Sequence, residues 1–365
     1  MKKQFSALVL CVALLLSVLT ACNGETTNTT TTTADGTTTT TTTTKFSGTT
    51  MTFAKGPTTK APTTTKPKPT KPKPTEVNGV KVPQVAYDEG AVKLAFQDEF
   101  DSMATFDFTG QGQPGKNWYI DFPYDPSSAT TKDYTVSNGV LSIKPVTTQT
   151  VSFGSYGRKA KTGYTWKFGY AETRMRFPVK NIPPLGSSSR VMWPSFWSIG
   201  ITDYTGAKWP VSNLGVGYTE SAELDMFEAW QLTDGTIVFS GTLHHHVKKP
   251  DGGVLNGANA NAMGNRKDTY ILDEEWHTYS TLWKPGYVAW YMDGEFMHSV
   301  EYAKDKLPTY FGRYNKEPYL APASDSTWEG VFSNLETEEM VVIIGGGDKL
   351  WPVEVDFVRI WEFED

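Results

Sequence analysis

The chain has 365 residues and a formal net charge of −6. Its first 75 residues carry nine lysines against two acids, so the remainder is strongly acidic, which argues against nucleic acid as a partner. All 12 tryptophans lie at or after Trp118, and both cysteines precede residue 23, so the foldable part begins late and has no disulfide framework.

The N-terminus has the pattern of an export signal. Two lysines at positions 2 and 3 precede an apolar run over residues 7–18. The four residues Leu19–Cys22 resemble a bacterial lipobox, which implies removal of residues 1–21 and lipid attachment to Cys22. That resemblance predicts a protein anchored on the extracellular face of a bacterial cell membrane. An ordinary signal peptide or a short membrane anchor are the alternatives, although the run is short for a spanning helix.

Residues 22–77 have the composition of a linker. Threonine dominates up to Thr50, and a Thr-Lys-Pro-Lys-Pro sequence then occurs twice, over residues 65–74. Such a segment buries too little apolar surface to offset its ordering entropy, so we expect it to be disordered and extended. The folded part is then residues 78–365, a length that suits one all-β domain.

From residue 92 onward the sequence alternates between short strands and turns. Hairpins are predicted around Asn138-Gly139 and around Pro285-Gly286, with a further tight turn at Asp293-Gly294. The strands of this region are expected over residues 92–100, 134–136, 140–143, 170–177, 278–283, 288–292 and 355–361. No long helical periodicity is present, so the pattern predicts an all-β sandwich or jelly roll.

Residues 223–228, with the sequence Glu-Leu-Asp-Met-Phe-Glu, place three acids in an otherwise apolar strand. Glu223 and Asp225 would share one face because side chains alternate. A β-bulge between Asp225 and Glu228 would return Glu228 to that face. Closely spaced carboxylates of unequal pKa are what glycoside hydrolysis requires. An acidic edge strand, or acids scattered on a helix, remain the alternatives.

The hexapeptide resembles the Glu-x-Asp-x-x-Glu signature of glycoside hydrolase family 16 in its bulged, laminarinase- or agarase-like form. Other segments resemble the family in the same order: 96–100 (Phe-Gln-Asp-Glu-Phe), 134–143, 169–175 (Gly-Tyr-Ala-Glu-Thr-Arg-Met), 193–197 (Trp-Pro-Ser-Phe-Trp), 242–244 (Thr-Leu-His), 276–279 (Trp-His-Thr-Tyr) and 355–359 (Val-Asp-Phe-Val-Arg). The resemblance implies a β-jelly-roll sandwich of two antiparallel sheets with a concave substrate cleft.

The resemblance also implies a retaining endo-hydrolase that acts on a β-linked polysaccharide. Carried onto this chain, Glu223 is the nucleophile, Asp225 the helper and Glu228 the acid/base. The expected substrate is a β-1,3-glucan or a mixed-linkage β-glucan. A β-galactanase or agarase-like hydrolase, a transglycosylase and a non-catalytic glycan-binding lipoprotein are the alternatives. We expect a monomer that needs no cofactor for catalysis.

Four further residues are expected to contact substrate. Trp193, Trp197 and Trp230 offer broad apolar faces for sugar rings, although large aromatic residues also serve as core. His244 falls beside the acids by its position in the family pattern. A metal bound by the run of three histidines at 244–246 is disfavoured, because no cysteine or carboxylate spacing completes a zinc site.

A structural calcium is a further expectation from the resemblance. Asp356 lies in an otherwise apolar strand and matches a side-chain ligand position of the family, and Gly139 matches a backbone-carbonyl position. Oxygen ligands of this kind suit calcium. The alternative for Asp356 is a hydrogen-bonded or partly exposed polar residue.

Overall fold

The computed structural model divides the chain into two compact units, Met1–Thr70 and Lys71–Asp365. The structure describes residues 25–32, 38–46, 49–54, 75–109, 113–119, 131–144, 149–151, 153–154, 162–178, 194–200, 219–232, 234–248, 270–303, 306–313, 319–320, 335–346 and 353–364. Cys22 and the Thr-Lys-Pro-Lys-Pro repeat lie outside these residues. Within them, no helix is both long and apolar enough to cross a bilayer.

The first unit contains a three-stranded antiparallel sheet in the order β1-β2-β3. Its strands are β1 (Glu25–Thr32), β2 (Thr38–Phe46) and β3 (Thr49–Ala54). This differs from the linker without secondary structure that the composition predicts. Threonine is β-branched and favours extended backbone, and strand pairing uses backbone groups that any sequence supplies.

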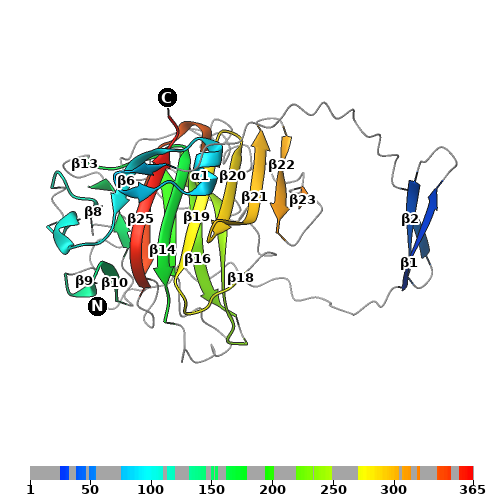
Figure 1. Cartoon of the computed structure of the whole chain (residues 1–365), viewed down its shortest axis with the longest axis horizontal. Coiled ribbons are helices and arrows are strands. Elements are labelled where there is room, and N and C mark those ends of the chain that lie inside the picture. Colours follow the sequence, from blue (N-terminus) through cyan, green and yellow to red (C-terminus); the bar gives the residue numbers. More distant parts are fainter. Residues whose placement is uncertain are drawn as a thin grey trace, which may run out of the picture. The chain divides into compact units, whose positions relative to one another are not determined.

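The second unit is built on two large sheets, of which one has ten strands. These are β6 (Lys93–Asp98), β9 (Tyr134–Ser137), β10 (Val140–Ile143), β14 (Gly169–Arg176), β19 (His277–Lys284), β20 (Tyr287–Met292), β21 (Glu295–Ala303), β22 (Lys306–Gly312), β23 (Tyr319–Leu320) and β25 (Val353–Glu362). Their order is β23-β22-β21-β20-β19-β14-β25-β10-β9, with β6 also paired to β25. Figure 1 shows β25, in red, beside β14, in green.

The other large sheet has eight strands. These are β7 (Phe106–Asp107), β8 (Trp118–Tyr119), β11 (Gln149–Val151), β15 (Pro194–Gly200), β16 (Thr219–Gln231), β17 (Ile237–Lys248), β18 (Tyr270–Ile271) and β24 (Met340–Gly346). Their order is β18-β17-β16-β15-β24-β11-β8-β7. All pairs in both sheets are antiparallel except β7 with β8. The predicted all-β class with two antiparallel sheets is therefore confirmed.

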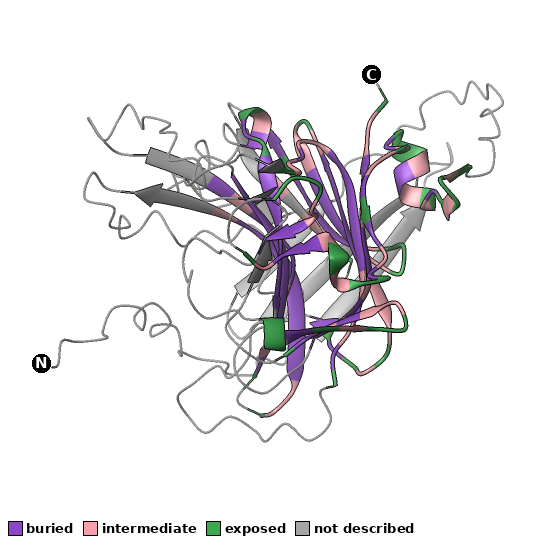
Figure 2. Cartoon of the chain, turned by 90° about the vertical axis from the view of Figure 1, so that its left-hand side faces the viewer, coloured by how far each residue is buried: buried purple, intermediate pink, exposed green. Residues whose placement is uncertain are grey.

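One hydrophobic core lies between the two sheets. Phe227 of the eight-stranded sheet stacks on Phe177, which follows β14, and its ring centroid lies 4.4 Å from that of Tyr279 on β19. On β24, for example, the alternate residues Met340, Val342 and Ile344 are buried in this cluster. Figure 2 shows that buried residues concentrate in the strands, whereas turns carry the exposed ones. The other face of β16 points away from this core.

The predicted tight turns are confirmed. Asn138 and Gly139 have φ angles of 54° and 72°, and Asp293 and Gly294 have 52° and 79°. Two successive positive φ values define the primed turns that suit the twist of β-hairpins. These turns join β9 to β10 and β20 to β21, so each connects strands that pair directly.

A short N-terminal segment covers the outer face of the ten-stranded sheet. It contains β4 (Glu76–Val77), β5 (Val80–Lys81) and the helix α1 (Gln84–Glu89), which ends at Gly90. A second apolar cluster is buried beneath it, formed by Val82, Ala86, Ala91, Tyr170, Leu282 and Trp361. The remaining short elements are η1 (Met103–Thr105), η2 (Thr131–Asp133), β12 (Phe153–Gly154) and β13 (Thr162–Gly163).

Candidate active site

Strand β16 carries the three acids in the middle of the eight-stranded sheet, between β17 and β15. Leu224 and Phe227 are fully buried and belong to the core between the sheets. Glu223 and Glu228 are half-buried, and Asp225 is 1% exposed. The strand therefore has one apolar face in the core and an acidic face on the other side.

A β-bulge keeps the three acids on one face. Asp225 pairs with Thr242 on β17, whereas Glu228 pairs with Ser240. Two residues of β16 lie between these pairs, but only one residue of β17 does. The register against β15 shifts at the same point. The bulge that the spacing predicts is confirmed, and it restores Glu228 to the face of Asp225.

Asp225 lies between the two glutamates. Burial raises the pKa of the Asp225 carboxyl well above its ordinary value, and interactions with Glu228 and Glu223 raise it further through charge and hydrogen bonding. A carboxyl group in such surroundings keeps its proton at a pH at which an isolated carboxyl group is ionised. The site can therefore hold a shared proton beside two carboxylates in a place that solvent barely reaches.

His244 extends this group onto β17. It is the cross-strand partner of Glu223, and its Nε2 lies 2.8 Å from Oδ2 of Asp225. One donor atom from each of Glu223, Asp225 and His244 lies within 4.8 Å of the others, which is also the donor set of a metal site. The side-chain contact between His244 and Asp225 already uses two of these atoms. The side chains of the two following histidines lie outside the described residues.

Two of the three expected tryptophans can be placed. Trp197 on β15 pairs with Asp225, and paired residues of neighbouring strands share a face. Its side chain is 7% exposed and does not belong to the core cluster. Trp230 lies two residues after Glu228 and is half-buried, so it also lies on the acidic face. Trp193 lies outside the described residues. Substrate contact by all three stays a prediction.

Sequence reasoning missed three small polar residues on the same face. Ser195 and Ser240 pair with Glu228 from either side, and Thr242 pairs with Asp225. All three are buried. The alternation of Ser240, Thr242 and His244 along one strand was a usable signal. No such signal pointed to Ser195 on β15, because the sequence does not show which strands are neighbours in the sheet.

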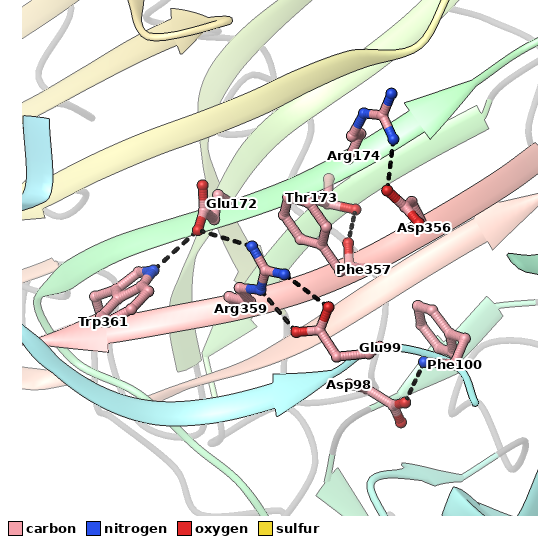
Figure 3. Close-up of polar contacts among 10 residues, drawn as sticks. All are labelled: Asp98, Glu99, Phe100, Glu172, Thr173, Arg174, Asp356, Phe357, Arg359 and Trp361. Atoms are coloured by element: carbon pink, nitrogen blue, oxygen red, sulfur yellow. Dashed lines mark hydrogen bonds and ion pairs between the residues drawn. The ribbon is translucent and has the colours of Figure 1, made fainter. Parts of the chain in front are cut away.

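The residues expected to hold calcium lie on the ten-stranded sheet. Gly139 occupies the turn between β9 and β10. Asp356 on β25 accepts a hydrogen bond from Nη1 of Arg174, 2.6 Å from its Oδ2, as Figure 3 shows. A calcium ion needs an anionic oxygen, and this one is paired with a guanidinium. Only Oδ2 of Asp356 takes part in this ion pair, and calcium binding by Asp356 and Gly139 stays a prediction.

A second carboxyl with a raised pKa lies in the same region. Burial raises the pKa of Glu172 on β14 to about 7, although a hydrogen bond from Trp361 and the charge of Arg359 oppose the shift. Arg359 binds Glu99 through two hydrogen bonds of 2.7 and 2.6 Å (Figure 3). The positive charge of Arg359 is therefore divided between Glu99 and Glu172. Glu172 belongs to the other sheet from the three acids and has the partners of a structural residue.

Comparison with known proteins finds a family model and two curated relatives that match part of this chain. Residues 254–341 match the family model described as glycosyl hydrolases family 16, which is less than half of the chain. The glucan endo-1,3-beta-glucosidase A1 of Niallia circulans is 22% identical over 184 residues, covering 47% of this chain and 23% of that protein. The endo-1,3-1,4-beta-glycanase ExsH of Rhizobium meliloti is 23% identical over 240 residues, covering 58% and 43%.

The chain thus spans less than half the length of these curated relatives. Among solved structures, the endo-beta-1,3-glucanase from Pyrococcus furiosus is similar with a TM-score of 0.44 and 17% identity, covering 80% of this chain and 99% of that one. The chain therefore contains a segment of the family 16 type together with a β fold that carries three acids on one face.

Proposed function

We propose that the chain is a retaining endo-β-glycanase with Glu223, Asp225 and Glu228 as its catalytic carboxyls. One observation carries the proposal: the bulge in β16 places all three on one face, with Asp225 buried between the glutamates. A structural role does not explain this cluster, because burying interacting acids lowers the stability of the fold. The family match and the two glycanase relatives support the same reaction class.

In the first step Glu223 attacks the anomeric carbon while the glycosidic carbon–oxygen bond breaks. Glu228 gives its proton to the leaving sugar oxygen, so that no free alkoxide forms. A covalent glycosyl-enzyme with inverted configuration results. Carboxyl groups in retaining enzymes stand about 5–5.5 Å apart. Glu223 and Glu228 lie on either side of Asp225 and both interact with its carboxyl, which brings their side chains toward one another.

In the second step water attacks the same carbon and Glu228 accepts its proton. The bond to Glu223 breaks, and the second inversion restores the original configuration. Asp225 keeps the two glutamates distinct, because its raised pKa lets it hold a proton and donate it to the carboxylate that bears charge. His244 contacts Asp225 and fixes its orientation.

The substrate we propose is a β-1,3-glucan or a mixed-linkage β-glucan. One curated relative is named a glucan endo-1,3-beta-glucosidase and the other an endo-1,3-1,4-beta-glycanase, at 22% and 23% identity. Trp197 and Trp230 flank the acids on the same face and would stack against sugar rings. We further propose that lipid on Cys22 anchors the enzyme at the outer side of the cell membrane, as a monomer.

A polysaccharide panel tests this function directly. Release of reducing ends should be measured for laminarin, mixed-linkage β-glucan, agarose and a β-galactan, with Glu223→Ala as the inactive control. We expect the wild type to cleave the first two internally, which shortens the polymer before small sugars appear. NMR of the first product should show a retained anomeric configuration.

Other results would redirect the proposal. Activity only on agarose or the galactan would change the substrate, and oligosaccharides longer than the starting ones would indicate a transglycosylase. Tight binding of a glycan with no cleavage by the wild type would favour a binding lipoprotein. An inverted first product would overturn the roles of Glu223 and Glu228.

A further inference from the structure

A tryptophan from the opposite sheet reaches the bulge that carries the acids. Trp290 lies on β20 of the ten-stranded sheet, and its indole is 1% exposed. Its Nε1 donates a hydrogen bond of 2.8 Å to the backbone carbonyl oxygen of Asp225. Asp225 is the residue at which the ladder between β16 and β17 shifts register. The indole therefore binds the backbone where the bulge begins.

The space for this indole comes from a glycine. Gly241 is the single residue of β17 opposite the bulge, between the partners of Asp225 and Glu228. A Cβ atom at Gly241 would lie 2.0 Å from Cδ1 of Trp290. Contacts below about 3 Å between carbon atoms are strongly repulsive, so a side chain here and the indole exclude each other. Gly241 and Trp290 thus form one fitted pair beneath the acids.

His298 on β21 completes the arrangement. Its ring stacks on Trp290 with centroids 4.5 Å apart, and its Nε2 lies 3.2 Å from the carbonyl oxygen of Gly241. Burial lowers the pKa of His298 to about 3, so the ring is neutral at physiological pH. A carbonyl oxygen only accepts, so Nε2 carries the proton and donates it. Both strands of the bulge are therefore held through their carbonyls by side chains of the other sheet.

We propose that Trp290, supported by Gly241 and His298, is a positioning residue that fixes the bulge and hence the relative placement of Glu223, Asp225 and Glu228. A bulge interrupts the regular ladder and leaves backbone groups without their usual partners. The indole supplies one such partner in the core, where an unsatisfied carbonyl is costly. Without it the bulge could relax along β16, and a slip of one residue would turn a side chain to the other face.

The effect on catalysis rests on the proposed function, whereas the effect on the bulge does not. Trp290→Phe removes the donor and keeps an aromatic ring. Trp166→Phe is the matched control, since Trp166 is also 1% exposed and its Nε1 donates a 3.0 Å hydrogen bond to Ser198 in the core, away from the acidic face. Each variant loses one buried indole hydrogen bond, so their losses of stability should be similar.

Two measurements on the folded proteins separate positioning from stability. The first is kcat and KM on the best glycan across pH. The second is the titration of the Asp225 carboxyl, followed by carbon-13 NMR with labelled aspartate and assigned with Asp225→Asn. For Trp290→Phe we expect kcat to fall about 10- to 100-fold with KM changed less than about threefold, because small misplacements of catalytic groups cost this much. The Asp225 titration should shift, and Trp166→Phe should match the wild type in both.

His298→Phe provides a second route if Trp290→Phe does not fold. It keeps a ring against Trp290 and removes the bond to Gly241, so a smaller change in the same direction is expected. An Asp225 titration identical to wild type in the folded variants would overturn the inference. So would equal kcat losses in Trp290→Phe and Trp166→Phe. If the wild type cleaves no glycan, the proposed function fails, and the NMR titration alone still decides whether Trp290 positions the bulge.

Discussion

The three acids differ in surroundings more than in chemistry. Asp225 is nearly inaccessible, whereas Glu223 and Glu228 are half-buried on the same face. A group that bonds to sugar must be reachable, and a group that only tunes protonation need not be. This difference supports assigning the covalent and proton-transfer steps to the glutamates and the helper role to Asp225.

The two glutamates should respond oppositely to azide. Glu223→Ala should abolish hydrolysis, because no covalent intermediate can form. With an activated aryl glycoside, azide should restore turnover from the open face and give an inverted glycosyl azide. Glu228→Ala should still form the intermediate from that donor, and azide should give the retained product.

NMR of the glycosyl azides distinguishes these outcomes, and circular dichroism of each variant controls for folding. Asp225→Asn is the useful comparison, because it should stay active with a shifted pH profile and need no azide. A retained azide from Glu223→Ala would mean that another group is the nucleophile.

Trp197 and its neighbour offer a test of which face contacts substrate. Phe196 is fully buried in the core, whereas Trp197 lies on the acidic face beside Asp225. Trp197→Ala should reduce kcat/KM about tenfold through lost stacking. Phe196→Leu should lower stability by about 1 kcal/mol and leave kcat/KM of the folded protein unchanged. The reverse pattern, measured by kinetics and thermal unfolding, would make Trp197 a core residue.

At the scale of elements, local signals predicted local structure well. Asn138-Gly139 and Asp293-Gly294 form their hairpin turns because few other residues tolerate two positive φ angles in succession. The bulge was predictable because an extra residue between Asp225 and Glu228 is needed to keep acids out of the core. The final strand was predictable from its apolar alternation.

Long-range features could not be predicted in the same way. Neither the pairing of Trp197 with Asp225 nor the bond from Trp290 to the Asp225 carbonyl leaves a local pattern. Burial of Asp225 also depends on neighbours distant in sequence. The strands in the threonine-rich segment were missed because composition was weighed above the β-propensity of threonine.

Glu172 on β14 should make stability depend on pH. Its pKa of about 7 in the folded state exceeds the ordinary value of 4.5, so the folded protein binds more protons than the unfolded chain between these values. Stability from this group is therefore full below about pH 4.5 and is lost as pH rises to about 7. The free energy of unfolding should therefore fall less between pH 4.5 and pH 7.5 in Glu172→Gln than in the wild type, by roughly 2–4 kcal/mol.

Urea unfolding at several pH values measures this difference. Glu301→Gln, at an exposed position of β21, is the control for the general effect of removing one negative charge. Equal pH dependence in the wild type and Glu172→Gln would show that this carboxyl has the same pKa in the folded protein as in the unfolded chain.

At the scale of the whole molecule, anchoring can be tested independently of catalysis. Cys22→Ala should abolish metabolic labelling with a fatty acid and release the protein from membranes. Polysaccharide cleavage by the released protein should stay within about twofold of wild type, because a surface tether contributes no catalytic group. Cys11→Ala is the matched control and should be labelled normally. Equal labelling of Cys22→Ala and wild type would contradict the lipid anchor.

Strand β25 has a consequence for how the protein is made. It pairs with β14, β10 and β6, and the paired residues Lys93 and Glu362 are 269 positions apart. A ribosome delivers β6 before β25, so during synthesis the ten-stranded sheet at first lacks the strand that joins β14 to β10. Pairings this distant form slowly. The β14 and β10 strands therefore cannot be joined through β25 until this strand has left the ribosome.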